Sequence, residues 1–210
     1  MTTLTISYYG LSCFAISAKT GNDTVNIVCD PYDTKETGLK LPRTMDADIL
    51  TITSNKPLHN NVSAVNKPGM TINEPGEYEK SGVFVYGIPT ESGVIYRFEF
   101  EDLVLVHLGG LAHTLTSSEL EKLENVDILL LPVGGGDMID YKKAVDAANQ
   151  IEPRVIVPMN YKMPSLNVEL DIIDKFLKEY GAKTENMPKL KIASKDLPQE
   201  DTRVIVLEKA

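Results

Sequence analysis

Hydrophobic and polar residues occur in short alternating runs through the first half of the chain, a pattern typical of β-strands. The runs that we expect to be strands are residues 4–9, 13–17, 24–29, 48–53, 83–88, 94–100 and 103–107. Asp30-Pro31 ends the third run, because proline cannot continue a central strand. The pattern predicts a β-rich first half, with residues 32–46 as a loop and 73–77 as a turn.

The second half changes to an alternation of helices and strands. Thr116 and Glu119 have the spacing of a capping box, which predicts a helix reaching about Leu123 or Glu124. Further helices are expected from about 138 to 151 and from 171 to 180, and strands at 126–131, 155–159, 190–192 and 203–207. The fold class is therefore α/β (α+β). The chain has no evident linker or repeat, so we interpret residues 1–210 as a single domain.

The charge balance limits the partners that the chain could bind. It has 30 acidic and 21 basic side chains, a formal net charge of -9. This argues against nonspecific binding of nucleic acid or anionic membrane, although a local basic patch stays open. Cys13 and Cys29 lie in apolar runs and are interpreted as buried free thiols. No signal peptide and no run of membrane-spanning length is evident, so we expect a cytoplasmic protein.

Several stretches in order resemble the metallo-β-lactamase superfamily, in its short branch of Zn-dependent hydrolase-like proteins related to the L-ascorbate-6-phosphate lactonases. They are the strand and polar loop at 47–65, PGEYE at 75–79, GVFVYGIPT at 82–90, HLGGLAHTLT at 107–116, VDILLLPVGG at 126–135 and IEPRVIVPMNY at 151–161. The resemblance implies a four-layer αββα sandwich, with two sheets packed face to face. It also implies a metal site, with zinc as the family cofactor, at the loop that follows strand 48–53.

The metal-ligand positions that the resemblance implies are mostly substituted. The family pattern is His-x-His-x-Asp-His in this loop, then a histidine, a bridging aspartate and a last histidine further along. The implied subsites are Ser54, Lys56 and His107 for the first metal, and Leu58, His59, Gly110 and Asn160 for the second. Only His59 and His107 keep the family residue. The family's N-terminal Gly-His-Ser-Cys-Phe is also changed, with Leu11 in place of the histidine.

The substitutions remove the chemistry that the family needs. A catalytic zinc takes about three protein ligands and one open position, and one imidazole per subsite falls short. Lys56 would place a positive charge near the ion, and Leu58 cannot bind it. Without the metal, water is not activated as a nucleophile. We therefore expect no cofactor, no bound metal and no catalytic residues, with His59 and His107 as remnants of the family site.

Several interpretations of the retained residues stay open. Ser54, Lys56, His59, His107 and Asn160 are candidates for binding a small anionic molecule, with the charge of Lys56 replacing that of the metal. Alternatively, the two histidines are hydrogen-bonded structural residues and Lys56 faces solvent.

Three functions follow from the sequence. The first is a pseudoenzyme with a binding or assembly role. The second is an active hydrolase of a phosphorylated or lactone-type molecule, using a different site that includes His113, Asp30 or the retained histidines. The third is nucleic-acid binding, which the acidic balance disfavours. A homo-oligomer is compatible with each.

Overall fold

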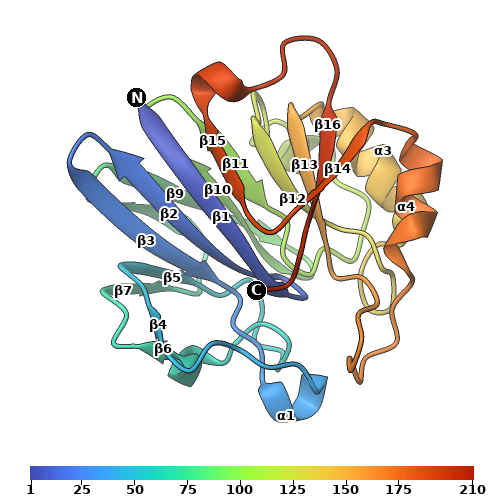
Figure 1. The fold of residues 1–210 in the computed structure, drawn as a ribbon, viewed down its shortest axis with the longest axis horizontal. Coiled ribbons are helices and arrows are strands. Elements are labelled where there is room, and N and C mark those ends of the chain that lie inside the picture. Colours follow the sequence, from blue (N-terminus) through green and yellow to red (C-terminus); the bar gives the residue numbers. More distant parts are fainter.

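The structure, a computed structural model, describes all 210 residues as two β-sheets packed face to face (Figure 1). The six-stranded sheet has the order β15 (Leu190–Ala193), β1 (Thr2–Gly10), β2 (Cys13–Thr20), β3 (Asp23–Cys29), β5 (Ile49–Thr51) and β7 (Met70–Ile72). The eight-stranded sheet has the order β14 (Thr184–Met187), β16 (Arg203–Leu207), β13 (Val155–Met159), β12 (Ile128–Pro132), β11 (Val104–His107), β10 (Gly93–Glu99), β9 (Val83–Thr90) and β8 (Gly76–Lys80).

The remaining elements are short or lie outside the sheets. The strands β4 (Met45–Asp46) and β6 (Val65–Asn66) form a separate pair. The helices are α1 (Thr34–Thr37), α2 (Ser117–Leu120), α3 (Tyr141–Ile151) and α4 (Ile173–Tyr180), with 3-10 turns at Val62–Ala64 and Ser194–Asp196. Helices α3 and α4 lie beside each other next to β12, β13, β14 and β16 (Figure 1). The expected sandwich of two sheets packed face to face is confirmed (Figure 1).

The core explains why these segments are strands. Along β1, buried and partly exposed residues alternate, so one face of the strand meets the other sheet. By contrast, β12 and β13 are buried at every residue, as parallel strands covered on both faces are. One cluster of 49 buried hydrophobic residues joins the two sheets and the helices. The predicted free thiols are confirmed: Cys13 and Cys29 are buried, and burial raises the pKa of Cys29 to about 12.

Some predicted boundaries are wrong. The expected loop at 32–46 contains α1 and β4, and the expected turn at 73–77 already includes the start of β8. The capping box at Thr116 and Glu119 is present, but its helix ends at Leu120. The strand expected at 48–53 is reduced to Ile49–Thr51, because Thr53 turns away to bind a buried carboxylate. Local hydrophobicity did not indicate these tertiary contacts.

Parallel strands bring the candidate residues together. β3 pairs with β5 in parallel, so Asp30 after the one and Thr53 after the other reach the same edge. In the second sheet β11, β12 and β13 are parallel, so His107 and the segment after Met159 also share an edge. The β1–β2 turn joins the two edges, because His107 and the Asn160 backbone N–H bond the carbonyl oxygens of Ser12 and Leu11, and the Ser12 hydroxyl lies 3.0 Å from Nδ1 of His59. The sheets therefore build the site that the sequence placed in the polar loop.

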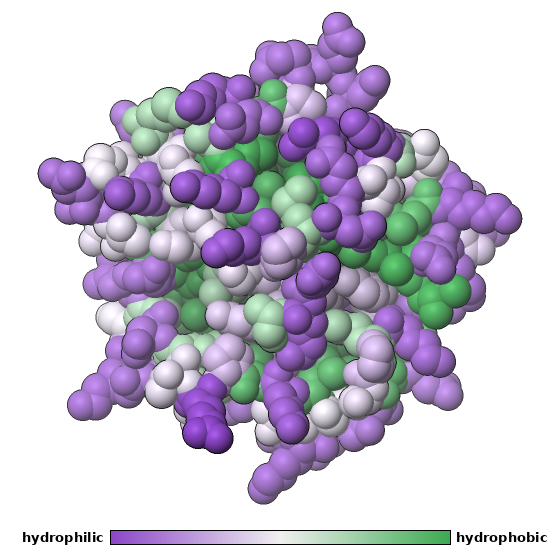
Figure 2. All heavy atoms as spheres, viewed as in Figure 1, coloured by the Kyte–Doolittle hydropathy of each residue, from purple (hydrophilic) through white to green (hydrophobic).

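The surface is mostly polar. Figure 2 shows hydrophilic side chains projecting all around this face, with hydrophobic side chains visible between them in smaller areas. The large hydrophobic residues that are exposed are few: Met1, Val62, Phe84 and Ile172. None of the helices has the length and apolar character that crossing a membrane would require.

Candidate functional site

Asp30 is the centre of the site. Its carboxylate is completely buried, and a buried carboxylate needs hydrogen-bond donors to offset the loss of water. Oδ1 accepts the backbone N–H of Thr53 at 2.7 Å, and Oδ2 accepts the Thr53 hydroxyl at 2.5 Å. Oδ2 also lies 2.7 Å from Nδ1 of His59. The end of β3 and the loop after β5 are therefore joined through one side chain.

The Asp30 contact fixes the state of His59. Burial by itself raises the pKa of Asp30, but the charge of His59 and its hydrogen bond outweigh burial, so the pKa is lowered. The carboxylate is ionised at neutral pH and can only accept, so Nδ1 of His59 carries the proton. The Ser12 hydroxyl lies 3.0 Å from the same nitrogen. His59 is thus oriented as a buried partner of Asp30.

His107 has both ring nitrogens engaged. It is completely buried at the end of β11, and its Nε2 donates to the carbonyl oxygen of Ser12 at 2.9 Å. The backbone N–H of Gly109 donates to Nδ1 at 3.1 Å. Burial lowers the pKa of His107, in spite of the nearby charge of Asp30. His107 is therefore a neutral imidazole that ties β11 to the β1–β2 turn. We call Ser12, Asp30, Thr53, His59 and His107 the polar cluster.

A second group of side chains lies beside the polar cluster and is hydrophobic. It contains the buried residues Leu11, Cys13, Tyr32, Leu39, Met138 and Leu170. Leu58 packs against this group, which we call the apolar cluster. Leu11 and Leu58 are two of the positions at which the sequence departs from the family pattern. The polar residues implied there are replaced by side chains that pack together, so the substitutions are linked by a shared environment.

Gly110, at the position of the implied bridging aspartate, lies directly beside His59. A β-carbon at residue 110 would be 3.0 Å from Nε2 of His59, at the limit of a tolerable contact. It would also be 3.9 Å from the Met138 side chain. The His59 ring therefore uses the space that a side chain at 110 would enter, and Gly110 connects the polar cluster to the apolar cluster.

The side chains of the other predicted residues form no hydrogen bond with His59 or His107. Nζ of Lys56 lies 3.2 Å from Oδ2 of Asp137, and these side chains are 59% and 81% exposed. Ser54 accepts the backbone N–H of Lys56. Asn160 is buried, with its backbone N–H bound to the Leu11 carbonyl and its Nδ2 without a partner. Anion binding by these residues stays a prediction.

His113 belongs to a different arrangement. Its Nε2 lies 3.0 Å and 3.2 Å from the two carboxylate oxygens of Glu119. Glu119 also closes the capping box with Thr116, and the Thr116 and His113 hydrogen bonds lower its pKa against the raising effect of burial. His113 thus holds the start of α2.

Sequence reasoning gave too little weight to three members of the site. Asp30 was considered only as a residue that a different site could include, while Ser12 and Thr53 were not considered. A signal for Asp30 was present, because an acidic residue at the end of an apolar strand must find donors when it is buried. Ser12 and Thr53 follow ordinary strand and turn patterns. Only the pairing of β3 with β5 shows that Thr53 meets Asp30.

The donor set does not fit a metal centre of the family type. No group of three or more His, Cys, Asp or Glu side chains is placed to hold a metal ion. His107 has no free nitrogen, and Nδ1 of His59 is bound to Asp30. A zinc site needs about three ligands of this kind. We therefore derive no reaction step through a metal for this chain.

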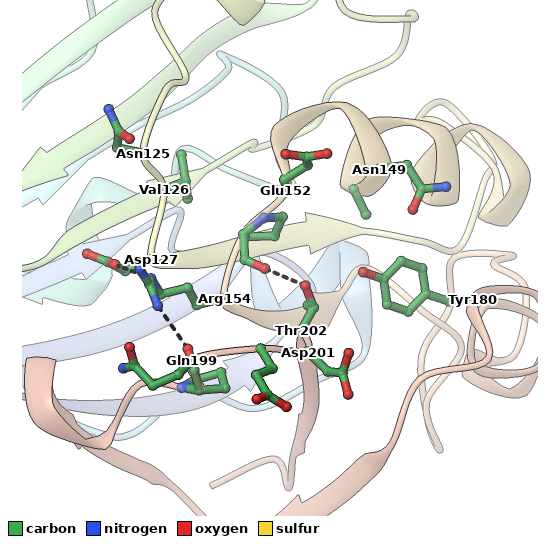
Figure 3. Close-up of a pocket in the computed structure, with 14 residues that line it drawn as sticks. Asn125, Val126, Asp127, Asn149, Glu152, Arg154, Tyr180, Gln199, Asp201 and Thr202 are labelled. Atoms are coloured by element: carbon green, nitrogen blue, oxygen red, sulfur yellow. Dashed lines mark hydrogen bonds and ion pairs between the residues drawn. The ribbon is translucent and has the colours of Figure 1, made fainter.

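A polar groove of about 600 Å³ lies at the other end of the parallel strands (Figure 3). It is lined by Asp127 before β12 and Arg154 before β13, whereas His107 ends β11 and Asn160 follows β13 at the opposite edge of the sheet. Arg154 lies between Asp127 and the segment at 198–199, and donates to the Pro198 carbonyl at 2.9 Å. The groove is therefore separate from the candidate site.

Similarity to known proteins covers most of the chain. A family model for the β-lactamase superfamily domain matches residues 5–160. A Thermotoga maritima structure, assigned to the Zn-dependent hydrolases of the metallo-β-lactamase superfamily, is 30% identical with a TM-score of 0.79. The match covers 98% of this chain and 100% of that one. A metallo hydrolase from Ignicoccus hospitalis has the same fold, with 17% identity, a TM-score of 0.67, and coverage of 91% and 99%.

Two curated relatives match a shorter segment. A metal-dependent hydrolase of Staphylothermus marinus is 34% identical over 61 residues, which are 29% of this chain and 27% of that protein. A metal-dependent hydrolase of Carboxydothermus hydrogenoformans is 35% identical over 57 residues, 27% of this chain and 25% of that protein. The chain thus matches only about a quarter of the length of these relatives.

The comparisons correct one expectation from the sequence. We expected no cofactor, but the relatives are named metal-dependent hydrolases and the Thermotoga maritima protein is assigned as Zn-dependent. These findings point to a metal cofactor in this group. The expectation relied on single ligand positions and disregarded the group as a whole. The family match over residues 5–160 confirms the resemblance seen in the sequence, and the chain belongs to the metallo-β-lactamase superfamily.

Proposed function

We propose that this chain is a binding or assembly protein on the metallo-β-lactamase fold that has lost the family's hydrolase activity. The observation that carries the proposal is the apolar cluster, in which Leu11 and Leu58, at two polar positions of the family pattern, pack in one group with Met138. A hydrolytic centre needs a polarised water molecule and a group that accepts its proton. Packed leucine and methionine side chains supply neither.

The hydrogen bonds of the two histidines support the same proposal. His59 is bound to Asp30, and His107 is bound at both nitrogens. Both nitrogens of His107 are engaged, so proton transfer by that ring would cost a buried hydrogen bond. The proposal concerns turnover, and a metal cofactor of the kind that the relatives' names indicate can be retained without it.

The test compares the chain with a variant in which the family residues are restored. Ser54→His, Lys56→His, Leu58→Asp, Gly110→Asp and Asn160→His are combined, and both proteins are assayed with Zn²⁺, Mn²⁺ and Fe²⁺ on phosphodiester and lactone substrates. We expect hydrolysis by the unmodified chain to equal the buffer rate, and the restored variant to gain metal-dependent hydrolysis if it folds. Hydrolysis by the unmodified chain that His59→Ala removes would contradict the proposal.

One observation favours the alternative of an active hydrolase with a different site. Because Asp30 holds Nδ1 of His59 at 2.7 Å, the ring has a fixed direction, and no hydrogen bond of the structure engages its Nε2. A carboxylate-oriented imidazole can act as a general base. This alternative predicts hydrolysis that needs no added metal and is lost in both His59→Gln and Asp30→Asn, whereas the main proposal predicts none.

A further inference from the structure

The strand β8 is the outer strand of the eight-stranded sheet. It pairs with β9 and with no other strand of this chain. One side of β8 therefore presents backbone N–H and C=O groups that the chain does not use for pairing. An exposed edge of this kind is able to accept a further strand from another molecule. The end strand is long enough for this, since five residues, Gly76–Lys80, are in the extended conformation.

The outward face next to this edge combines aromatic and acidic side chains. Its two cross-strand rows are Glu79, Phe84 and Glu99 in one, and Glu77, Tyr86 and Arg97 in the other. Phe84 is 48% exposed, which is unusual for a phenylalanine in a sheet. Residues directly opposite each other in an antiparallel pair are about 5 Å apart. Each aromatic ring is therefore next to the carboxylate of an edge residue.

Arg97, the cation in these two rows, already has hydrogen-bond partners within the chain. Nε of Arg97 lies 2.8 Å from Oε1 of Glu99, and its Nη1 donates to the Glu124 carbonyl at 2.6 Å. Glu77 and Glu79 form no ion pair in the structure, although Glu79 accepts the Gly82 backbone N–H. The edge strand therefore carries two carboxylates without an ion-pair partner, and Lys80 follows them on the alternate face of the strand.

The surroundings of Tyr86 are also acidic. The charge of Glu99, together with burial and the charge of Glu77, raises the pKa of Tyr86. Tyr86 also lines a hollow of about 680 Å³ that begins at Pro75 and Gly76. Two cations, Arg97 and Lys122, also line this hollow. The space next to the edge is therefore large enough for long side chains.

We propose that β8 binds an extended segment of a partner protein that carries Lys or Arg at alternate positions. Side chains of a strand alternate between two faces, so such a segment places its cations opposite Glu77 and Glu79. Their aliphatic stems pack towards Phe84 and Tyr86, and a cation over an aromatic ring is attracted to it. This inference rests on the proposed binding role and names its partner class.

A second copy of this chain fits the edge less well. Antiparallel pairing of two β8 strands would set Glu77 and Glu79 against the same carboxylates, and like charges directly opposite each other destabilise a sheet. Two chains with a net charge of -9 also repel each other. The charges that prevent self-pairing are the ones that attract a basic strand.

The test uses a fluorescein-labelled peptide of alternating lysine and valine, titrated with the full chain and followed by fluorescence anisotropy. We expect the double variant Glu77→Lys/Glu79→Lys to bind about tenfold more weakly, and Phe84→Ala to show a smaller loss. The matched control is Glu200→Lys/Asp201→Lys, which makes the same change of net charge in the groove of Figure 3. We expect the control to bind within about twofold of the unmodified chain.

A second measurement distinguishes strand pairing from charge alone. The same peptide with alternate backbone nitrogens methylated keeps its charge but cannot form the ladder, and we expect it to lose most binding. Equal losses in the two double variants, full binding of the methylated peptide, or no binding of the original peptide would overturn the proposal. A dimer of the chain that Glu77→Lys/Glu79→Lys dissociates would assign the edge to a second copy instead. The hydrolysis assay is independent of each of these results.

Discussion

The polar cluster and the apolar cluster touch at two points of the chain, because Ser12 follows Leu11 and His59 follows Leu58. The polar cluster keeps residues of the family pattern and holds them with internal hydrogen bonds. In the apolar cluster, Leu11 and Leu58 stand at polar positions of the family pattern and pack in one group with Met138. A site that loses its reactivity must still be packed. Each buried polar side chain must either form hydrogen bonds, as in the polar cluster, or be replaced by an apolar side chain, as in the apolar cluster.

The largest expected effect is on the polar cluster. Asp30→Ala leaves the donors of Thr53 and His59 buried without an acceptor, so we expect the free energy of unfolding to fall by about 3–5 kcal/mol. Urea denaturation followed by circular dichroism measures this change. The matched control is Asp137→Ala at an exposed carboxylate, for which we expect a change of about 0.5 kcal/mol or less. If both variants lost a similar free energy of unfolding, the buried hydrogen bonds of Asp30 would contribute no more to stability than an exposed carboxylate does.

A smaller effect is expected from returning the family residue to the apolar cluster. Leu11 is completely buried, so Leu11→His places an imidazole among apolar side chains and should cost about 2–3 kcal/mol. Leu11→Met is the control, because it keeps the volume and the apolar character, and it should cost about 1 kcal/mol. Both variants are compared by urea denaturation. Equal stabilities would mean that the site near residue 11 is polar or open to water.

The buried imidazole of His107 gives a pH dependence. Its folded-state pKa is lowered by burial, so below the unfolded pKa of about 6.5 the unfolded chain binds more protons than the folded chain. We therefore expect stability to fall as the pH is lowered from 7 towards 5, with a contribution from His107 of up to about 1.4 kcal/mol per pH unit.

The His107→Gln variant isolates this contribution. Glutamine can still donate to the Ser12 carbonyl but does not titrate, so the slope of unfolding free energy against pH should be smaller than in the unmodified chain. Asp30 acts in the same direction only below about pH 4, since its folded-state pKa is also lowered. Equal slopes in the two proteins between pH 7 and 5 would contradict the neutral, buried state of His107.

The smallest effect is expected where neither cluster is involved. Lys56 and Asp137 form an ion pair with exposed side chains, and such pairs contribute about 0–1 kcal/mol. Lys56→Ala, Asp137→Ala and their combination form a double-mutant cycle, and we expect a coupling energy of about 0.5 kcal/mol or less. A coupling of several kcal/mol would mean that Lys56 is part of the buried site.

The sequence predicted the fold better than the site. The order of strands and helices, and the resemblance in several stretches, were sufficient for the sandwich, because burial on one or two faces leaves a periodic pattern. His59 and His107 were also recognised. The pattern did not show that β3 and β5 run in parallel and place Asp30 beside Thr53, since such contacts depend on pairing between distant segments.

The exposed edge at β8 of the eight-stranded sheet could not be predicted from the sequence either. Residues 73–77 were predicted to form a turn, so no strand was expected at Glu77 and Glu79. Only the register with β9 places them beside Tyr86 and Phe84. The arrangement of charged and aromatic side chains at this edge depends on which residues of the neighbouring strand lie opposite, so the sequence could not predict the proposed binding edge.

The most direct test of the account is the tautomer of each imidazole, measured by long-range ¹H–¹⁵N correlation NMR at neutral pH. In the structure, both rings support the fold through fixed hydrogen bonds. We therefore expect that His59 carries its proton on Nδ1, facing Asp30, and that His107 carries its proton on Nε2, facing the Ser12 carbonyl. Either ring in the opposite tautomer, or in exchange between the two, would contradict the account.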